Sequence, residues 1–145
     1  MRVGEAASAS VAAAAAGVAV IVLAGVMAID VGLYAAARAR AVAAADAAAL
    51  AAAPVTFRSF GAGGGPQGEA SRFAAANGAE LVRCDCPADP SWAGRTVEAT
   101  VSIRVDLIVL GDRAVTATSR AEFIPAEAVV MPAQSSSMVP SSRSR

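Results

Sequence analysis

The chain contains no lysine and no histidine, and all 12 of its basic residues are arginine. These absences exclude Ser-His-Asp and Cys-His catalysis, lysine Schiff bases, P-loop phosphate binding and histidine metal sites. Two cysteines without histidine are too few for a structural zinc site. The 12 acidic residues balance the arginines, so no net charge favours nucleic acid. The sequence therefore predicts no enzyme, no cofactor, no metal and no nucleic-acid partner.

What the chain does have is a long uncharged run, VAAAAAGVAVIVLAGVMAI, which covers residues 11–29 and is 19 residues long. At about 1.5 Å per residue it spans roughly 28 Å, close to the thickness of a bilayer's hydrocarbon layer. A cleaved signal peptide is the alternative, and Ala35–Ala37 imitates a cleavage site. Signal peptides, however, have a shorter apolar core and a basic flank, whereas here Arg2 is offset by Glu5. We expect residues 1–30 to form the N-terminus and an uncleaved membrane helix.

The orientation of this helix follows from charge and from cysteine usage. The positive-inside rule compares Arg2 and the amino terminus on one side of the helix with Arg38 and Arg40 on the other. Taken literally, it favours a cytoplasmic location for the C-terminal side, which does not suit an exported domain. An N-terminal anchor can nevertheless insert with its N-terminus inside, and the two cysteines favour an oxidising exterior. We expect a single-pass protein of the cell membrane, with a cytoplasmic N-terminus and an extracytoplasmic C-terminal domain.

The helix signal continues beyond the apolar run, because no proline interrupts the chain before Pro54. A helix from Ala6 to Ala53 would be about 72 Å long. The charges after residue 29 point in different directions around the helix axis, so no amphipathic stripe emerges. These charges are Asp30, Arg38, Arg40 and Asp46. The prediction depends instead on alanine, the strongest helix former, and we expect residues 31–53 to form an Ala-rich stalk.

Residues 54–124 are predicted to form an extracytoplasmic α+β domain. Residues 55–68 contain GAGGGPQG, which predicts a flexible loop, and residues 68–78 predict a short helix that ends at Asn77-Gly78. Over Val97–Leu107 every odd position is apolar and every even position is polar, which predicts a half-buried strand with its odd-numbered side chains inward.

A second alternating run, Val115–Phe123, follows Gly111-Asp112-Arg113, which is predicted to be the turn of an antiparallel hairpin. A shorter strand over Glu80–Cys86 is expected to join this hairpin. The Pro/Ser-rich residues 125–145 have no apolar period and are predicted to be disordered.

The exported residues alone number about 71, a size at which a single hydrophobic core is marginal. Their sheet has one apolar face, and the short helix of residues 68–78 cannot cover it alone. We therefore expect the Ala-rich stalk to supply the missing layer, with Val42 and Leu50 as its large apolar side chains. The expected fold is α+β: a long N-terminal membrane-spanning helix continues as the stalk and packs on a small antiparallel sheet.

This arrangement resembles the type IV pilins. The segment AIDVGLYAAARARAVAAADAAALAAA is similar to the N-terminal motif of the TadE/TadG-like proteins of the tight-adherence (Flp/Tad) pilus machinery. Their pattern is an apolar run, A-x-D-x-G, arginine positions, and then A-A-D-A-A-A-L-A. The resemblance covers about residues 10–53. The matching positions are Ala28, Asp30, Gly32, Tyr34, Arg38, Arg40 and Ala44 to Leu50. The later segment AAANGAELVRC, followed by strands, is similar to the short actinobacterial TadE-like members.

The resemblance implies a minor pilin or pseudopilin with a structural role in assembling a Flp/Tad-type pilus or secretion system. The implied partners are other pilins or pseudopilins, the inner-membrane assembly platform and the membrane itself. The chain departs from processed pilins at one point, because Glu5 directly follows Gly4 instead of lying five residues into the mature chain. The alternative of another class is a membrane-anchored surface binding module unrelated to pili. A hydrolase using paired carboxylates is the weakest alternative.

The candidate helix-packing and assembly residues lie on the membrane helix and the stalk. They are Gly17, Gly25, Asp30, Gly32 and Asp46. The three glycines fall within about 80° of one another around the helix, either as a smooth ridge for helix packing or as scattered small residues of an alanine-rich helix. Asp30 is either a polar contact with a partner helix or an interfacial residue that marks the end of the lipid.

Alternation places Cys84 and Cys86 on the same strand face as Val82. Their Cα atoms would be about 6.6 Å apart, at the upper edge for a disulfide. We expect either buried thiols, which we favour, or a disulfide, with a metal or redox centre as the least favoured interpretation. The nearby carboxylates lack the spacing of a calcium loop and are expected to be solvated. These are Glu80, Asp85 and Asp89.

Overall fold

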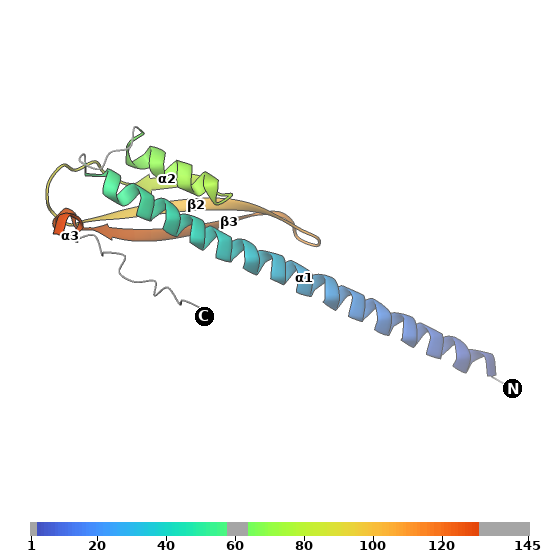
Figure 1. Cartoon of the computed structure of the whole chain (residues 1–145). Helices are drawn as coiled ribbons and strands as arrows, with labels where there is room; N and C mark the ends of the chain where they lie inside the picture. The colour runs from blue at the N-terminus through green and yellow to red at the C-terminus, as the bar shows by residue number, and fades with distance from the viewer. Residues whose placement is uncertain (1–2, 58–63, 131–145) are drawn as a thin grey trace, which may run out of the picture.

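The computed structural model of the chain describes residues 3–57 and 64–130 (Figure 1). Its dominant element is helix α1 (Val3–Val55), which is 53 residues long and unbroken. The other elements are, in chain order, α2 (Gly65–Ala76), β1 (Glu80–Asp85), β2 (Arg95–Leu107), β3 (Gly111–Phe123) and α3 (Pro125–Val130). The predicted continuation of the helix as far as Ala53 is confirmed, and the helix ends one residue after Pro54.

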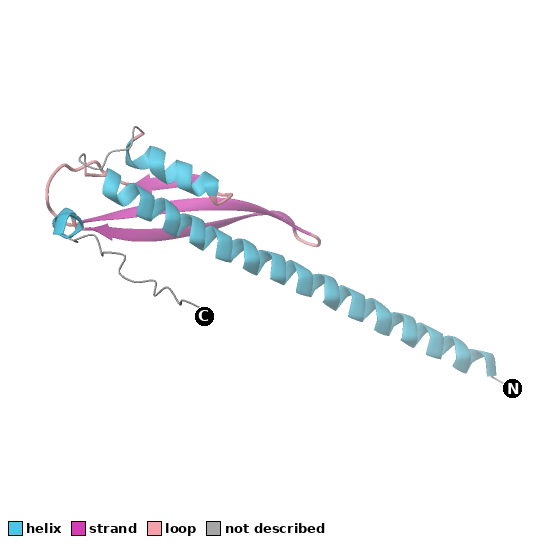
Figure 2. Ribbon diagram, in the orientation of Figure 1, coloured by secondary structure: helices cyan, strands magenta, loops and turns pink. Residues whose placement is uncertain are grey.

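The elements form two layers (Figure 2). The three strands make an antiparallel sheet in the order β1-β2-β3. The C-terminal half of α1 and the whole of α2 lie on one face of this sheet, while the N-terminal half of α1 extends beyond it. The α+β layout predicted from the sequence, a long apolar N-terminal helix with a small antiparallel sheet, is therefore confirmed.

Alanine forms most of the core between the two layers. The buried side chains of α1 recur every three or four residues, so burial follows a helical stripe that faces the sheet and α2. They are Ala37, Ala41, Ala44, Ala45, Ala48, Ala49, Ala52 and Ala53. On the sheet side, Val97 and Val101 are completely buried. Because alanine is so short, it lets the helix backbone approach the sheet closely.

The large apolar side chains of the stalk were expected to lie in this layer, and that expectation is wrong. Val42 is 41% exposed and Leu50 is 65% exposed. They lie outside the stripe of buried alanines, on the surface of α1. The stalk covers the sheet as predicted, but it does so with its smallest side chains.

The predicted strand register of the hairpin is confirmed. In β2 the odd-numbered Val97, Ala99 and Val101 are buried, whereas the even-numbered side chains are more exposed. On the outer face, Thr100 Oγ1 lies 2.9 Å from Thr118 Oγ1 in a cross-strand hydrogen bond. The turn, however, precedes its predicted place: it consists of residues 108–110, and Gly111 pairs with Leu107 as the first residue of β3. Gly111 has a φ of 66°, which glycine adopts without steric cost.

Helix α2 begins at Gly65, earlier than predicted, because Pro66 suits a first helical turn, where its missing N–H is not needed. The predicted stop is confirmed. Asn77 caps the C-terminus and donates a side-chain hydrogen bond of 2.8 Å to the carbonyl oxygen of Phe73, and Gly78 follows with a φ of 71°. Residues 58–63 of the predicted glycine-rich loop lie outside the described residues.

Strand β1 has a register shift between Leu81 and Arg83. Simple alternation predicted that Val82 shares a face with Cys84, but the shift brings Leu81 to the core side with Cys84 and leaves Val82 exposed. At the end of the sheet, residues 125–130 form α3 and not the predicted disordered segment. The rest of the predicted disordered tail, residues 131–145, lies outside the described residues.

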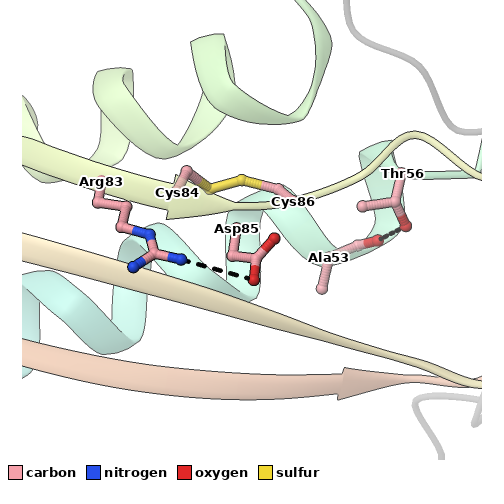
Figure 3. The surroundings of a disulfide bond; sticks show 6 residues. All are labelled: Ala53, Thr56, Arg83, Cys84, Asp85 and Cys86. Carbon is pink, nitrogen blue, oxygen red and sulfur yellow. Dashed lines mark hydrogen bonds and ion pairs between the residues drawn. A yellow bond between two sulfur atoms is a disulfide. The ribbon is translucent and has the colours of Figure 1, made fainter.

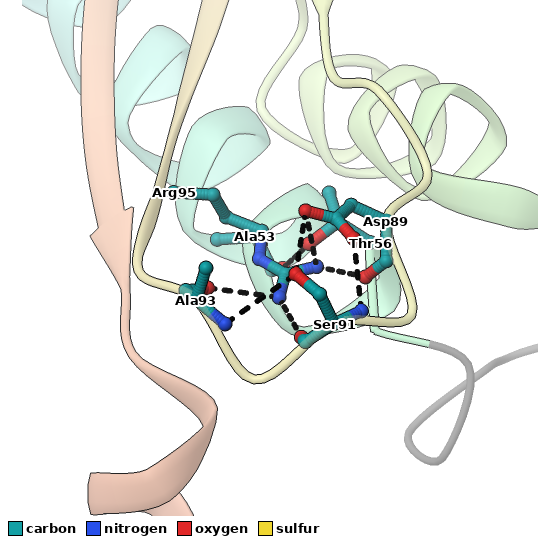
Figure 4. Close-up of polar contacts among 6 residues, drawn as sticks. All are labelled: Ala53, Thr56, Asp89, Ser91, Ala93 and Arg95. Carbon is teal, nitrogen blue, oxygen red and sulfur yellow. Dashed lines mark hydrogen bonds and ion pairs between the residues drawn. The ribbon is translucent and has the colours of Figure 1, made fainter.

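The end of the domain opposite the hairpin turn is held by Arg95 (Figure 4). The Arg95 side chain is only 8% exposed, and its guanidinium donates hydrogen bonds to the backbone carbonyls of Asp89, Ser91 and Ala93. The N–H of Asp89 in turn donates to the carbonyl oxygen of Thr56 at 2.9 Å, which ties this loop to the end of α1. Hydrogen bonds from the backbone N–H and the hydroxyl of Ser91 lower the pKa of the Asp89 carboxyl.

Candidate helix-packing surface

The N-terminal half of α1 exposes large apolar side chains along its length. They include Val18, Val20, Ile21, Val22, Leu23, Met27 and Ile29. One part of the helix is long and apolar enough to cross a membrane. Only 6% of its most apolar stretch is buried against the rest of the protein. That low value is unlike the core helix of a soluble domain and suits a membrane anchor or a signal sequence.

The three candidate glycines lie in this exposed region and at its end. A Cβ added at Gly17, Gly25 or Gly32 would meet nothing within 4 Å in the part of the chain that the structure describes. At about 100° per residue, the glycines lie roughly 140–160° from Asp30 around the helix. Because Asp30 faces the hairpin, the glycine ridge faces away from the domain, which leaves it open to a second helix.

Asp30 contacts the hairpin of its own chain. Its side chain is only 4% exposed, and its two oxygens accept hydrogen bonds from the backbone N–H groups of Ile108 at 2.7 Å and Val109 at 2.9 Å. The carboxylate thus satisfies two backbone donors of the β2–β3 turn. This contact joins residues far apart in sequence and was not anticipated from the sequence, which offered only a partner helix or an interfacial position for Asp30.

Two more polar residues of the stalk contact β3. The guanidinium of Arg38 donates a hydrogen bond to the backbone carbonyl of Thr116, and the carboxylate of Asp46 accepts one from the hydroxyl of Ser119. Asp30, Arg38 and Asp46 are spaced eight residues apart along α1. Polar side chains along α1 therefore fasten the helix to the hairpin: Asp30 bonds to the turn, and Arg38 and Asp46 bond to β3.

Cys84 and Cys86 form a disulfide (Figure 3), with their Cα atoms 5.4 Å apart. The sequence favoured buried thiols, and that interpretation is wrong; the disulfide was its second alternative. Both side chains are partly buried against the alanine core. Asp85, between them, is exposed and lies 4.0 Å from the guanidinium of Arg83 in an ion pair.

The turn of the hairpin is apolar, which the sequence analysis did not single out. Ile108, Val109 and Leu110 are 63%, 49% and 52% exposed. Beside them, a shallow apolar cavity of about 300 Å³ opens between the turn and α1. Its lining residues are Met27, Asp30, Val31, Tyr34, Leu107 and Leu110. A signal was present in the sequence: three consecutive large apolar residues at a hairpin turn, where glycine, asparagine and aspartate usually occur.

No group of His, Cys, Asp or Glu side chains suitable for a metal ion occurs among the residues that the structure describes. The site consists of an open helix face for packing and of side chains that hydrogen-bond to the hairpin. Comparison of the chain with protein-family models, with curated proteins and with solved structures gave no match.

Proposed function

We propose that the chain is a TadE/TadG-like minor pilin or pseudopilin, with a non-enzymatic structural role in the assembly of a Flp/Tad-type pilus or secretion system. One observation carries the proposal: a single unbroken helix is exposed and apolar in its first half and forms the covering layer of a small sheet in its second half. A pilin-type subunit needs this combination of a helix for assembly and a domain built on the same helix.

We further propose that α1 is an uncleaved, single-pass anchor in the cell membrane. Cleavage near Ala35–Ala37 would remove Asp30 and leave the N–H groups of Ile108 and Val109 without their acceptor. The disulfide favours an oxidising compartment for the C-terminal domain, and hence a cytoplasmic N-terminus. The glycine ridge, which faces away from the domain, suits packing against other pilins, pseudopilins or an inner-membrane platform.

Membrane location is tested first. The chain should resist extraction by alkaline carbonate, and a reporter fused after Phe123 should be active only on the outer side. Release by carbonate, or activity only on the cytoplasmic side, would contradict the anchor or its orientation.

The assembly role is tested in cells that carry this chain. Deleting it should abolish surface fibres, and the wild-type chain should restore them. Gly25→Leu should fail to restore fibres because it fills the glycine ridge. The matched control Ala19→Leu, an exposed position far from the ridge around the helix, should restore them. Unchanged fibres after deletion would favour the alternative, a surface binding module unrelated to pili.

A further inference from the structure

The β2–β3 turn lies at the level of Asp30, where the long uncharged run of α1 ends. Strand β2 runs toward this turn and pairs antiparallel with β3, so the hairpin points along α1 in the direction of its N-terminal half (Figure 1). A bilayer spanned by residues 11–29 would therefore meet the turn at its surface. This placement rests on the proposed membrane location of α1.

The surface presented at this level is continuous and apolar. Ile108, Val109 and Leu110 are all at least about half exposed, and Leu110 shares the apolar cavity with Val31 and Tyr34 of α1. The exposed apolar surface of α1 itself continues past Asp30. Such a concentration of large apolar side chains at one end of a small domain is unfavourable in water and marks a contact surface.

The backbone of the turn is also prepared for an apolar environment. The hydrocarbon layer of a bilayer offers no water to accept a hydrogen bond, so a backbone N–H group there needs an acceptor from the protein. The N–H groups of Ile108 and Val109 are both bonded to the Asp30 carboxylate. This explains why an acidic residue is buried at the edge of an apolar segment: it satisfies donors that water would otherwise have to reach.

Charged residues border the apolar turn on the side away from α1's apolar half. Arg104, Asp112 and Arg113 are exposed and line a shallow depression on the two strands behind the turn. Tyr34 lies beside Leu110 at the same boundary. Proteins that contact a bilayer commonly place apolar side chains toward the acyl chains and tyrosine and arginine at the level of the headgroups. The hairpin end of the domain has this arrangement.

We propose that the hairpin tip, residues 108–110, enters the boundary between headgroups and acyl chains of the bilayer that α1 spans. The sheet then has two membrane contacts, the helix and the tip, and the domain is held in one orientation. The occupant of the apolar tip is lipid and not a second copy of the chain.

The experiment uses the full chain in phosphatidylcholine vesicles, made with or without bromine atoms on the acyl chains, which quench tryptophan fluorescence within the bilayer. Trp92 is the single tryptophan, and it lies in the loop at the opposite end of the domain. The tip probe is Val109→Trp in a Trp92→Phe background. Val22→Trp in the same background reports on the anchor, and the unaltered chain provides the control through Trp92.

We expect the brominated lipid to remove a large share of the emission of the Val22 and Val109 probes and to leave Trp92 unchanged. Quenching of the Val22 probe alone, with the Val109 probe open to aqueous acrylamide, would overturn the tip's insertion and leave the anchor intact. A Val109 probe shielded from acrylamide only at high protein-to-lipid ratios, without quenching by bromine, would assign the tip to a second copy and also overturn it. Absence of quenching at both probes would refute the anchor, and the inference with it.

Folding of each variant is checked by its thermal transition. Should Val109→Trp fail to melt cooperatively, Ile108→Trp replaces it, because Ile108 is the more exposed of the two side chains. The same expected result and the same three contradicting results then apply.

Discussion

The two halves of α1 differ in the size of the side chains that they expose and bury. In the first half, large residues such as Ile21 and Leu23 are exposed. In the second half, the buried residues that pack against the sheet are alanines, whereas large residues such as Val42 and Leu50 are exposed. A lipid environment favours apolar area on the outside of a helix, whereas a helix that covers a sheet at short range needs small side chains. One unbroken helix thus combines an exposed apolar half with a half that covers the sheet.

Removing the second half of α1 should have the largest effect on the stability of the domain. A fragment that begins at Pro54 should not unfold cooperatively, because the face of the sheet that carries Val97 and Val101 loses its cover. A fragment that begins at Val31 keeps the whole alanine layer and should show a cooperative thermal transition. If both fragments melted equally sharply and at the same temperature, the helix would be only a tether.

A charge placed beneath the alanine layer should have the next largest effect. Val101→Asp buries an unpaired carboxylate at a position with no exposed surface, and should destabilise the fragment from Val31 by on the order of 4 kcal/mol. Thr100→Asp places the same group on the outer face of the same strand and should change the free energy of unfolding little. Urea unfolding of the two variants measures the difference, and equal destabilisation would show that the register of β2 is wrong.

The role of alanine itself is tested by enlarging it. Ala48 is fully buried, so Ala48→Leu should overpack the layer and cost about 1–3 kcal/mol in urea unfolding. Ala43→Leu makes the same change at an exposed position of the same helix and serves as the control. Leu50→Asp should also be tolerated, because Leu50 is exposed. A stability loss for Leu50→Asp as large as for Ala48→Leu would contradict the assignment of the buried stripe.

The smallest expected effect is at the junction of the two halves. Asp30→Ala removes the acceptor of two backbone N–H groups, which are partly buried, and should lower the unfolding free energy of the full chain in detergent by about 1 kcal/mol. Asp46→Ala removes an exposed carboxylate that contacts a single hydroxyl, and should cost less. Equal effects would show that the Asp30 contact adds no more stability than a surface hydrogen bond.

Alternation made the hairpin predictable from the sequence, because each side chain of Val97–Leu107 differs in polarity from its neighbours. The stalk was harder. Its buried stripe is invisible to hydropathy, since alanine occupies both buried positions such as Ala48 and exposed positions such as Ala43. The helix was predictable from propensity, but the face that covers the sheet was not, and the choice of Val42 and Leu50 as core residues followed size and was wrong.

The candidate site was predictable only where local pattern determines it. The spacing of the three glycines was enough to place them on one face of α1, because the period of an α-helix is known. The bond between Asp30 and the turn depends on a contact between residues 30 and 108, which no local pattern encodes. The disulfide brings the Cα atoms of Cys84 and Cys86 to 5.4 Å, closer than the rise of a regular strand predicts.

The absence of a break in α1 has a mechanical consequence. Residues 3–55 form a single rod, and the Asp30 carboxylate fastens the hairpin to this rod close to its midpoint. Within the described residues, no flexible linker separates the apolar half from the half that supports the sheet. A pull or a twist applied to the apolar half is therefore transmitted to the sheet as a displacement of the whole domain. The helix is a stiff rod, so a force applied to its apolar half would move the sheet directly.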